Sequence, residues 1–545
     1  MAERRLAPSL ATAAFWLGLA ALCLMGLSRD LWTPDEPREA EMSREMYLSP
    51  GVIPTLAGSP FYEKPPLYYW TVSAAYGLSG GPSAWSARLV SGACGFLTLL
   101  VVFLWGKRAK SRELGLAAAV LMALSLQFTV STHWIIIDPL LMLFAALASW
   151  AGYELACQGA SPKFLMLFYG SMALSMWTKG FIGPLCMAAG LTLHWIWERK
   201  SRPWKSFHPF YGLLFMALCF ASVGAAFYLA GGKEALYQWG WVNHVERFIN
   251  PSTTGHAQPF WYYLVALVAA SLPWLVPMAG IALPSFWKRS GGAGLKAYCA
   301  SLLGGGLLLL SASSTKRETY LLPLLPPLFI LMGLAWTAIQ SRAGEGSAKA
   351  RWALVLQVAI AGAWGIALPI AAAAYFKRLS LLDAALACVA LAALGLALYG
   401  FSKGRYSIGG NPAQAAGAAV GVVALFLIAV PALAPSKDMS PFIAKIGSMI
   451  PAGSPVAVLG GDETLCGIIP FVTGRGVTMV SEAPRGSSKA PAWLLWQGSD
   501  EATRAGLQSS GYALVVKRTF GSSRAVSLWR REAEGQGAKE RNGPS

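Results

Sequence analysis

Residues 31–70, LWTPDEPREAEMSREMYLSPGVIPTLAGSPFYEKPPLYYW, form the longest polar interruption in the first 400 residues of this chain, and they follow its first apolar segment. The stretch holds nine charged side chains, which are Asp35, Glu36, Arg38, Glu39, Glu41, Arg44, Glu45, Glu63 and Lys64. The sequence on both sides is hydrophobic, so such a charged cluster needs an explanation. We expect it to form the floor of an active site at a membrane surface.

The composition is that of a membrane protein. Apolar residues make up 55% of the 545 residues and charged residues only 13%, whereas a soluble protein carries about 25% charge. Long apolar runs recur along most of the chain, which predicts an α-helical polytopic membrane protein. The formal net charge of +18 lies largely in short loops between these runs. This distribution is typical of membrane topology, and we predict no nucleic-acid partner.

The apolar runs each approach the ~20 residues that a membrane span needs. They lie at 11–27, 85–105, 113–131, 136–156, 164–179, 181–197, 209–230, 261–286, 295–312, 321–339, 352–374, 381–401 and 413–433. We therefore predict about 13 transmembrane helices in a domain at 1–435. The first outer loop is expected at about 29–84.

The basic loops predict the orientation. Alternate connections rich in Lys and Arg lie at 106–113, 198–208, 287–296, 340–351 and 402–410. All of them fall on the same side as Met1, which the positive-inside rule makes cytoplasmic. An odd number of spans then places everything after Pro435 outside the cytoplasm.

The composition changes after Pro435. The short β-rich runs VAVLG, VTMV, AWLLW and YALVV are separated by Gly, Pro and Ser, and helical patterns occur at 440–449 and 500–509. This predicts a small extracytoplasmic α/β domain at 436–545. Its end, GQGAKERNGPS, has the composition of a disordered tail.

The first half of the polar loop has two interpretations. Thr33, Pro34, Asp35 and Glu36 have the form of a capping box with proline at the first helical position, so the two acids could simply start a helix. From Asp35 onward, Asp35 and Arg38 share one helical face, which suits a site.

The second half of the loop favours a site. In FYEKPP (61–66), Glu63 and Lys64 stand between aromatic residues and a double proline. The prolines fix their own φ and push Lys64 toward an extended conformation, so the charged pair is held in place. The alternative is an interfacial anchor, an aromatic belt with a snorkelling lysine.

Asp138 is an acid within the apolar segment HWIIIDPLLMLF. A carboxylate in the middle of a span costs about 2.5–3.5 kcal/mol, so Asp138 should lie near the outer surface with a partner. The predicted topology places it on the same side as Asp35. The alternative is a helix start, because Pro139 follows directly.

Two further polar clusters fall on the predicted outer side. WGWVNHVERFIN (239–250) offers His244 and Arg247, and SSTKRETYLLPLLPP (313–327) offers Lys316, Arg317 and Tyr320. Cations beside spans usually mark the cytoplasmic side, so a phosphate-bearing ligand would explain them here. The alternative is contact with lipid headgroups.

Taken together, these residues resemble the bacterial aminoarabinose (4-amino-4-deoxy-L-arabinose) lipid A transferase family, within the wider group of lipid-linked glycosyltransferases related to protein O-mannosyltransferases. The resemblance is carried by PDEPREAEMSREM (34–46) and FYEKPPLYYW (61–70) at their spacing. Asp138, NHVERF (243–248) and KRETYLLP (316–323) match further elements. Pro37 and the ETY segment depart from the pattern expected in that group.

The resemblance implies a GT-C fold in the bacterial inner membrane, with the outer loops and the C-terminal domain in the periplasm. It implies that a sugar passes with inversion from undecaprenyl phosphate to lipid A or a related acceptor, and that membrane lipids are partners. The implied catalytic residues are Asp35, Asp138 and Glu36. The implied phosphate-binding residues are Lys64, Arg247, Tyr320, Arg38 and Lys316. Glu63 and His244 would hold a divalent metal ion such as Zn, Mg or Mn.

Other functions remain open on the sequence alone. A related transferase could move a hexose or uronic acid to lipopolysaccharide core, glycan or protein. A lipid or ion transporter would also have many spans, but its polar site would lie near the membrane midplane, often between repeated halves. Here the acids lie in loops and the sequence shows no repeat. A non-catalytic scaffold would leave the set Asp35, Glu63 and Asp138 unexplained.

Overall fold

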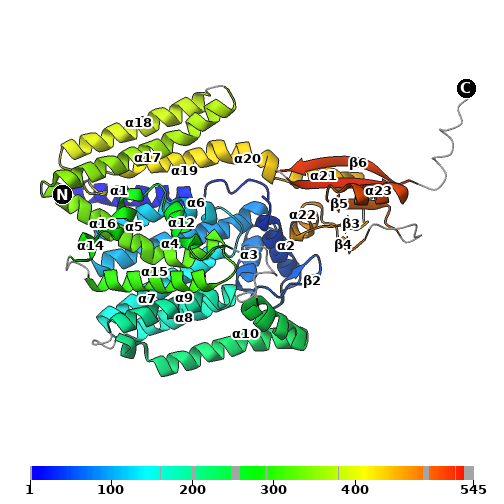
Figure 1. Ribbon diagram of the computed structural model, residues 1–545, viewed down its shortest axis with the longest axis horizontal. Coiled ribbons are helices and arrows are strands. Elements are labelled where there is room, and N and C mark those ends of the chain that lie inside the picture. Colours follow the sequence, from blue (N-terminus) through cyan, green and yellow to red (C-terminus); the bar gives the residue numbers. More distant parts are fainter. Residues whose placement is uncertain are drawn as a thin grey trace, which may run out of the picture.

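The computed structural model describes residues 3–159, 161–198, 203–246, 258–288, 293–377, 380–482, 490–521 and 523–532. The molecule is elongated, with a large helical body and a smaller sheet domain at one end (Figure 1). Between the two lie α2 (Asp35–Leu48), the hairpin β1 (Thr55–Leu56) and β2 (Ser59–Pro60), and α3 (Leu67–Leu78). These elements are the polar loop predicted at about 29–84.

The helical body is built from the predicted apolar runs, because helices satisfy their backbone hydrogen bonds internally and can therefore enter lipid. Its elements are α1 (Glu3–Cys23), α4 (Ala84–Ala109), α5 (Arg112–Ala123), α6 (Leu126–Thr132), α7 (Asp138–Gln158), α8 (Pro162–Lys179), α9 (Ile182–Trp197), η1 (Pro203–Phe207), α10 (Pro209–Tyr237), η2 (Gln238–Glu246), α12 (Tyr262–Ala270), α13 (Leu275–Ala282), α14 (Pro284–Trp287), α15 (Ala293–Ala312), η4 (Glu318–Leu324), α16 (Leu325–Gly344), α17 (Ala348–Tyr375), α18 (Leu381–Ser402), α19 (Ala413–Ala424), η5 (Leu425–Ala429) and α20 (Val430–Lys437).

The described helices that qualify as spans by length and composition are fewer than the about 13 predicted crossings. Among the described residues, eight helices are long and apolar enough to cross a membrane, or nine if the bent pair α5 and α6 is one span. Two of the remaining runs form shorter apolar helices, Thr12–Cys23 and Ile182–Trp197. The run predicted at 261–286 is divided into α12, α13 and α14, because Pro273 and Pro284 lack the N–H that would continue a helix.

The C-terminal domain is a five-stranded mixed sheet in the order β4-β3-β5-β7-β6, in which β3 is parallel to β4 and β5, and β7 is antiparallel to β5 and β6. The strands are β3 (Val456–Leu459), β4 (Val477–Val480), β5 (Trp493–Gln497), β6 (Tyr512–Phe520) and β7 (Arg524–Arg531). The helices are α21 (Ser440–Met449), α22 (Glu463–Thr473) and α23 (Glu501–Ser509). The predicted strands and the two predicted helices are confirmed, whereas α22 and β7 were not predicted. The tail 535–545 lies outside the described residues.

The side chains of β3 alternate between two cores, as the period of a strand requires. Val456 and Val458 pack with α21 and α22 on one face, and Ala457 and Leu459 pack with Leu507 of α23 on the other. Helix α22 therefore lies on the face of the sheet that is turned toward the helical body.

Helix α2 is the junction between the two parts of the molecule. It ends at Leu48, shortly before Pro50, a residue that disfavours helix in its predecessor. Helix α22 packs so closely on α2 that a Cβ at Gly467 would collide with the Pro37 carbonyl. The Thr464 hydroxyl also donates a hydrogen bond to the carbonyl of Pro34 (3.3 Å). The C-terminal domain thus adjoins the first residues of α2.

Candidate active site

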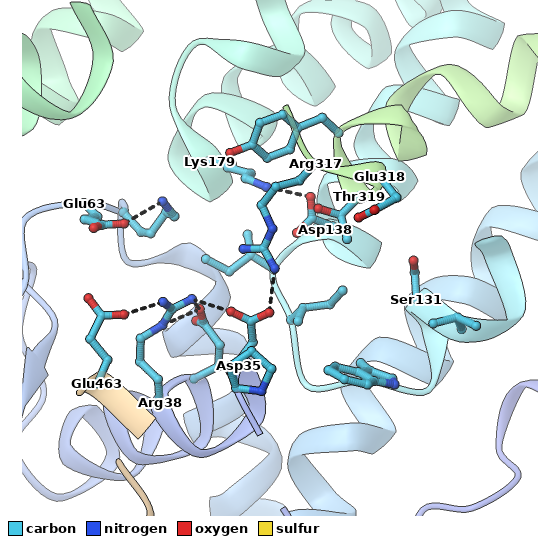
Figure 2. Close-up of a pocket in the computed structure, with 18 of the residues that line it drawn as sticks. Asp35, Arg38, Glu63, Ser131, Asp138, Lys179, Arg317, Glu318, Thr319 and Glu463 are labelled. Carbon is cyan, nitrogen blue, oxygen red and sulfur yellow. Dashed lines mark hydrogen bonds and ion pairs between the residues drawn. The ribbon is translucent and has the colours of Figure 1, made fainter. Parts of the chain in front are cut away.

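A cavity of about 660 Å³ opens where the start of α2, the start of α7 and the start of α22 meet. Its described charged lining comes from distant parts of the chain, namely Asp35, Arg38, Glu39, Glu63, Lys64, Asp138, Lys179, Arg317, Glu318, Asp462 and Glu463. Several of these side chains point toward one another across the cavity (Figure 2). The structure thus brings six of the predicted site residues to one cavity, which are Asp35, Arg38, Glu63, Lys64, Asp138 and Tyr320.

Asp35 lies between two guanidinium groups. Its Oδ2 accepts a hydrogen bond from Arg317 (2.7 Å), and its Oδ1 lies 3.3 Å from a nitrogen of Arg38. Burial alone would raise the pKa of Asp35, but the two arginines reverse this effect and hold that pKa below its ordinary value. Asp35 is therefore a carboxylate at neutral pH.

The capping-box interpretation does not describe these contacts. Helix α2 begins at Asp35, and its N-cap residue, Pro34, makes no side-chain capping bond. Because the carboxylate of Asp35 is directed to Arg317 and Arg38, the residue lies at a helix start without serving as its cap.

Arg38 connects α2 to the C-terminal domain. Its guanidinium lies 2.6 Å from Glu39 on its own helix and 2.6 Å from Glu463 at the start of α22. Glu463 and its neighbours Asp462 and Thr464 also line the cavity. Sequence reasoning missed these three residues, since a loop between a short strand and a helix carries no signal that it will face the membrane domain.

Asp138 has the cationic partner that its position required. At the first residue of α7, its Oδ1 lies 2.6 Å from Nζ of Lys179, the last residue of α8. The same ammonium lies 4.8 Å from the ring centroid of Tyr320, within range of a cation–π interaction. Lys179 was not predicted as a site residue, although a lysine in the tight turn between two apolar runs was a usable signal.

Glu63 and Lys64 lie side by side at the cavity wall. Their side chains form an ion pair of 3.2 Å and are 24% and 19% exposed, so both can meet a ligand. The aromatic-belt alternative places Lys64 at a lipid interface, whereas here it lines the charged cavity.

Of the two cations that precede Tyr320, the structure directs Arg317 into the cavity and not Lys316. The ammonium of Lys316 is buried and donates to the carbonyl oxygens of Ser313 (2.5 Å) and Gln258 (3.0 Å). Lys316 is not among the described lining residues of the cavity. Adjacent residues of an extended segment point in opposite directions, so Arg317 faces the cavity and Lys316 does not.

Glu36 is directed away from the cavity. Its carboxylate accepts two hydrogen bonds from Arg29 (2.6 and 2.7 Å) and two from Arg88 (3.1 and 3.2 Å). It also accepts from the backbone N–H groups of Trp32 (2.8 Å) and Ile135 (3.1 Å). These contacts join the start of α2 to α4 and to the loop before α7. The catalytic role predicted for Glu36 gains no support from this position, and we assign it a positioning role.

The two predicted metal ligands, Glu63 and His244, both lie in the described part of the chain. Glu63 lines the cavity beside Lys64, whereas Nδ1 of His244 lies 2.5 Å from the carbonyl oxygen of Trp239 and its ring packs against Phe181. Among the described residues, no group of three or more His, Cys, Asp or Glu side chains is arranged so that it could hold a metal ion. A divalent ion held by Glu63 and His244 stays a prediction. The predicted phosphate ligand Arg247 lies outside the described residues.

The sequence of this chain is similar to those of known glycosyltransferases. Residues 63–225 match the family model described as dolichyl-phosphate-mannose-protein mannosyltransferase. The chain is 30% identical over 329 residues to undecaprenyl phosphate-alpha-4-amino-4-deoxy-L-arabinose arabinosyl transferase 2 of Sodalis glossinidius (strain morsitans), covering 58% of each chain. It is 29% identical over 343 residues to the corresponding transferase of Erwinia tasmaniensis, covering 61% of this chain and 59% of that one. The match thus spans less than two thirds of these relatives.

The fold is shared over the whole length with a solved structure. The crystal structure of ArnT from Cupriavidus metallidurans bound to undecaprenyl phosphate superposes with a TM-score of 0.73, covering 98% of this chain and 99% of that one at 18% identity. Its apo form gives a TM-score of 0.70. The chain therefore has an ArnT-like fold of the GT-C type, a polytopic helical body with a small mixed-sheet domain. The predicted resemblance to the aminoarabinose transferases is confirmed by this similarity of sequence and fold.

Proposed function

We propose that this chain is an inner-membrane glycosyltransferase that moves 4-amino-4-deoxy-L-arabinose from undecaprenyl phosphate to lipid A. The observation that carries the proposal is the charged cavity, in which ionised Asp35 lies among the four cations Arg38, Lys64, Lys179 and Arg317 of the described lining. An acid beside several cations suits a reaction that develops positive charge on a sugar and negative charge on a departing phosphate. The similarity to arabinosyl transferases supports the choice of sugar.

In the proposed reaction, an oxygen of the acceptor attacks the anomeric carbon as the bond from that carbon to the phosphate oxygen breaks. The electron pair of this bond leaves with undecaprenyl phosphate, and attack from the opposite face inverts the anomeric centre. Because the leaving group is already a phosphate, it needs cations and no strong general acid. Lys64, Lys179 and Arg317 are positioned to supply them, with Tyr320 beside Lys179.

Asp35 has the properties of an electrostatic group and an orienting group. Because its pKa lies below the ordinary value for aspartate, it is a weak base for removing a proton from a hydroxyl group. A phosphate of lipid A is already anionic and needs no base. We therefore assign Asp35 the stabilisation of positive charge at the anomeric carbon and the orientation of the acceptor.

Binding of the donor phosphate would rearrange the ion pairs seen here. Arg317 lies 2.7 Å from Asp35, and the Arg317 side chain is 33% exposed, so it can turn toward a phosphate at small cost. Asp138 would hold the ammonium of Lys179 in place throughout.

Substituting Lys64 tests the phosphate assignment. We expect Lys64→Met to weaken binding of undecaprenyl phosphate and to slow transfer about 10- to 150-fold, because a desolvated charge-assisted contact is worth ~1.5–3 kcal/mol. Lys64→Arg should not restore it, since a planar guanidinium does not replace a compact ammonium at a confined site. Lipid-binding titrations and turnover assays on purified protein measure both effects.

The matched control is Lys445→Met, which removes an exposed lysine of the C-terminal domain. This variant should bind and turn over as the wild type does. Equal affinity and turnover for Lys64→Met and wild type would return Lys64 to the role of an interfacial anchor.

We also propose that the chain crosses the membrane about 13 times, with Met1 in the cytoplasm and everything after Pro435 in the periplasm. In this arrangement the helices α1, α8 and α9 and the divided run α12–α14 supply the four crossings beyond the nine candidate spans. A reporter enzyme that is active only in the periplasm should be active when fused at about residue 440. The same reporter fused within the basic loop 340–351 should be inactive, and the reverse pattern would contradict the orientation.

A further inference from the structure

A second cavity lies at the end of the molecule opposite the active site. It has a volume of about 440 Å³ and is lined by the α4–α5 junction, by α13 and α14, and by the first residues of α15 and the last turns of α16. Figure 1 shows α14 and α16 at the end of the helical body that is remote from α2 and α22. The cavity is therefore separate from the site described above.

The charged side chains in the described lining of this cavity are all positive. Lys110, Lys296 and Arg342 contribute cations, and Asp and Glu are absent from its described lining. The active-site cavity differs in this respect, since Arg38, Lys64, Lys179 and Arg317 each pair with an acid there. The charges of Lys110 and Arg342 on this lining repel each other, and an anion in the cavity would reduce that repulsion.

Arg342 is the strongest indication of a missing partner. Its Nε is buried and donates no hydrogen bond to any atom in the described part of the chain. A buried donor of this kind is destabilising when unsatisfied, and the planar guanidinium matches a phosphate or carboxylate group.

The remaining walls are suited to a lipid headgroup. Lys296 is buried and fixed, because its Nζ donates to the Phe286 carbonyl (2.9 Å) and lies 4.7 Å from the centre of the Phe286 ring. Leu334 and Ile339 supply apolar surface, and Ser111 also lines the cavity. Cations at helix ends beside apolar walls are typical of pockets that bind anionic lipids.

Topology alone does not require this arrangement. The three cations belong to the basic connections 106–113, 287–296 and 340–351, and the positive-inside rule asks only that such loops be basic. It does not require that one cation from each loop line a single cavity. We propose that this cavity binds the phosphate of an anionic glycerophospholipid headgroup, at the membrane face opposite the active site.

The test is lipid retention by the purified full-length protein. Native mass spectrometry with phosphatidylglycerol should show one retained lipid that phosphatidylcholine does not replace. Arg342→Gln and Lys110→Gln should each weaken this binding about 10-fold or more, the effect of losing one charge-assisted contact. Lys110 is exposed, so its substitution should leave folding intact.

The control is Lys349→Gln, which removes the same charge from an exposed residue outside the cavity. It should retain the lipid as wild type does. An equal loss in all three variants would show that only the overall charge of this face matters, and would overturn the proposal. Displacement of the lipid by millimolar inorganic phosphate would overturn it in favour of a site for free phosphate.

Discussion

Replacing Asp35 with asparagine should abolish detectable sugar transfer, a loss of at least about 100- to 1,000-fold, while leaving the protein folded and inserted. The substitution removes the negative charge at the floor of the cavity and keeps the shape of the side chain. Folding should survive because the partners of Asp35 have other interactions: Arg38 keeps Glu39 and Glu463, and the Arg317 side chain is 33% exposed to solvent.

The measurement is single-turnover transfer by purified protein, with thermal unfolding recorded in parallel. Glu45→Gln is the matched control, because it makes the same change on the same helix outside the described lining of the cavity. Glu45 accepts a hydrogen bond from the backbone of Gly58, and its substitution should leave the rate within a few fold of wild type. A normal rate for Asp35→Asn would mean that Asp35 only begins a helix.

The sequence was informative about the site wherever a charge stood in apolar surroundings. Asp35, Lys64 and Asp138 could be predicted because a charged group within a hydrophobic chain requires a partner or a function. The choice between Lys316 and Arg317 could not be made, since both are cations and only the backbone direction decides which enters the cavity. A pattern of charges carries no information about that direction.

The contribution of the C-terminal domain was beyond prediction for a different reason. Glu463 and Arg38 are separated by 425 residues in sequence, and their contact depends on α22 packing against α2. The composition after Pro435 indicated an α/β domain but not the face with which it docks. The close approach of Gly467 to the Pro37 carbonyl shows why that docking is specific, since any side chain there would collide.

The division of one predicted span into short helices was missed through the same limitation. Hydropathy over 261–286 predicts one span, and the structure divides this run at Pro273 and Pro284 into three short helices. Average hydropathy depends on how apolar the side chains are, and it does not include the backbone N–H groups that the two prolines lack. The presence of both prolines in the run was the sequence signal that the helix would be interrupted.

Substitution of Glu36, the neighbour of Asp35, should lower stability and leave turnover nearly unchanged, the reverse of what is expected for Asp35. We expect Glu36→Gln to lower the free energy of unfolding by about 3–5 kcal/mol, because removing one partner of a buried ion pair leaves an uncompensated charge. The side chains of Glu36 and Arg88 are both 0% exposed, so solvent cannot replace the lost carboxylate. The folded fraction should keep a turnover number close to that of wild type.

A double substitution separates these two effects. Glu36→Gln combined with Arg88→Gln removes both members of the fully buried pair, so it should be less destabilising than the sum of the single changes. Thermal unfolding of the four proteins in one detergent gives the coupling free energy, and turnover per folded molecule gives the catalytic effect. If Glu36→Gln kept wild-type stability and lost turnover, Glu36 would be the catalytic residue that the motif predicts. If Glu36→Gln lost stability and kept turnover, the adjacent acids Asp35 and Glu36 would have separate roles. Asp35 would act on the substrate, and Glu36 would hold the start of α2 against α4 and the loop before α7.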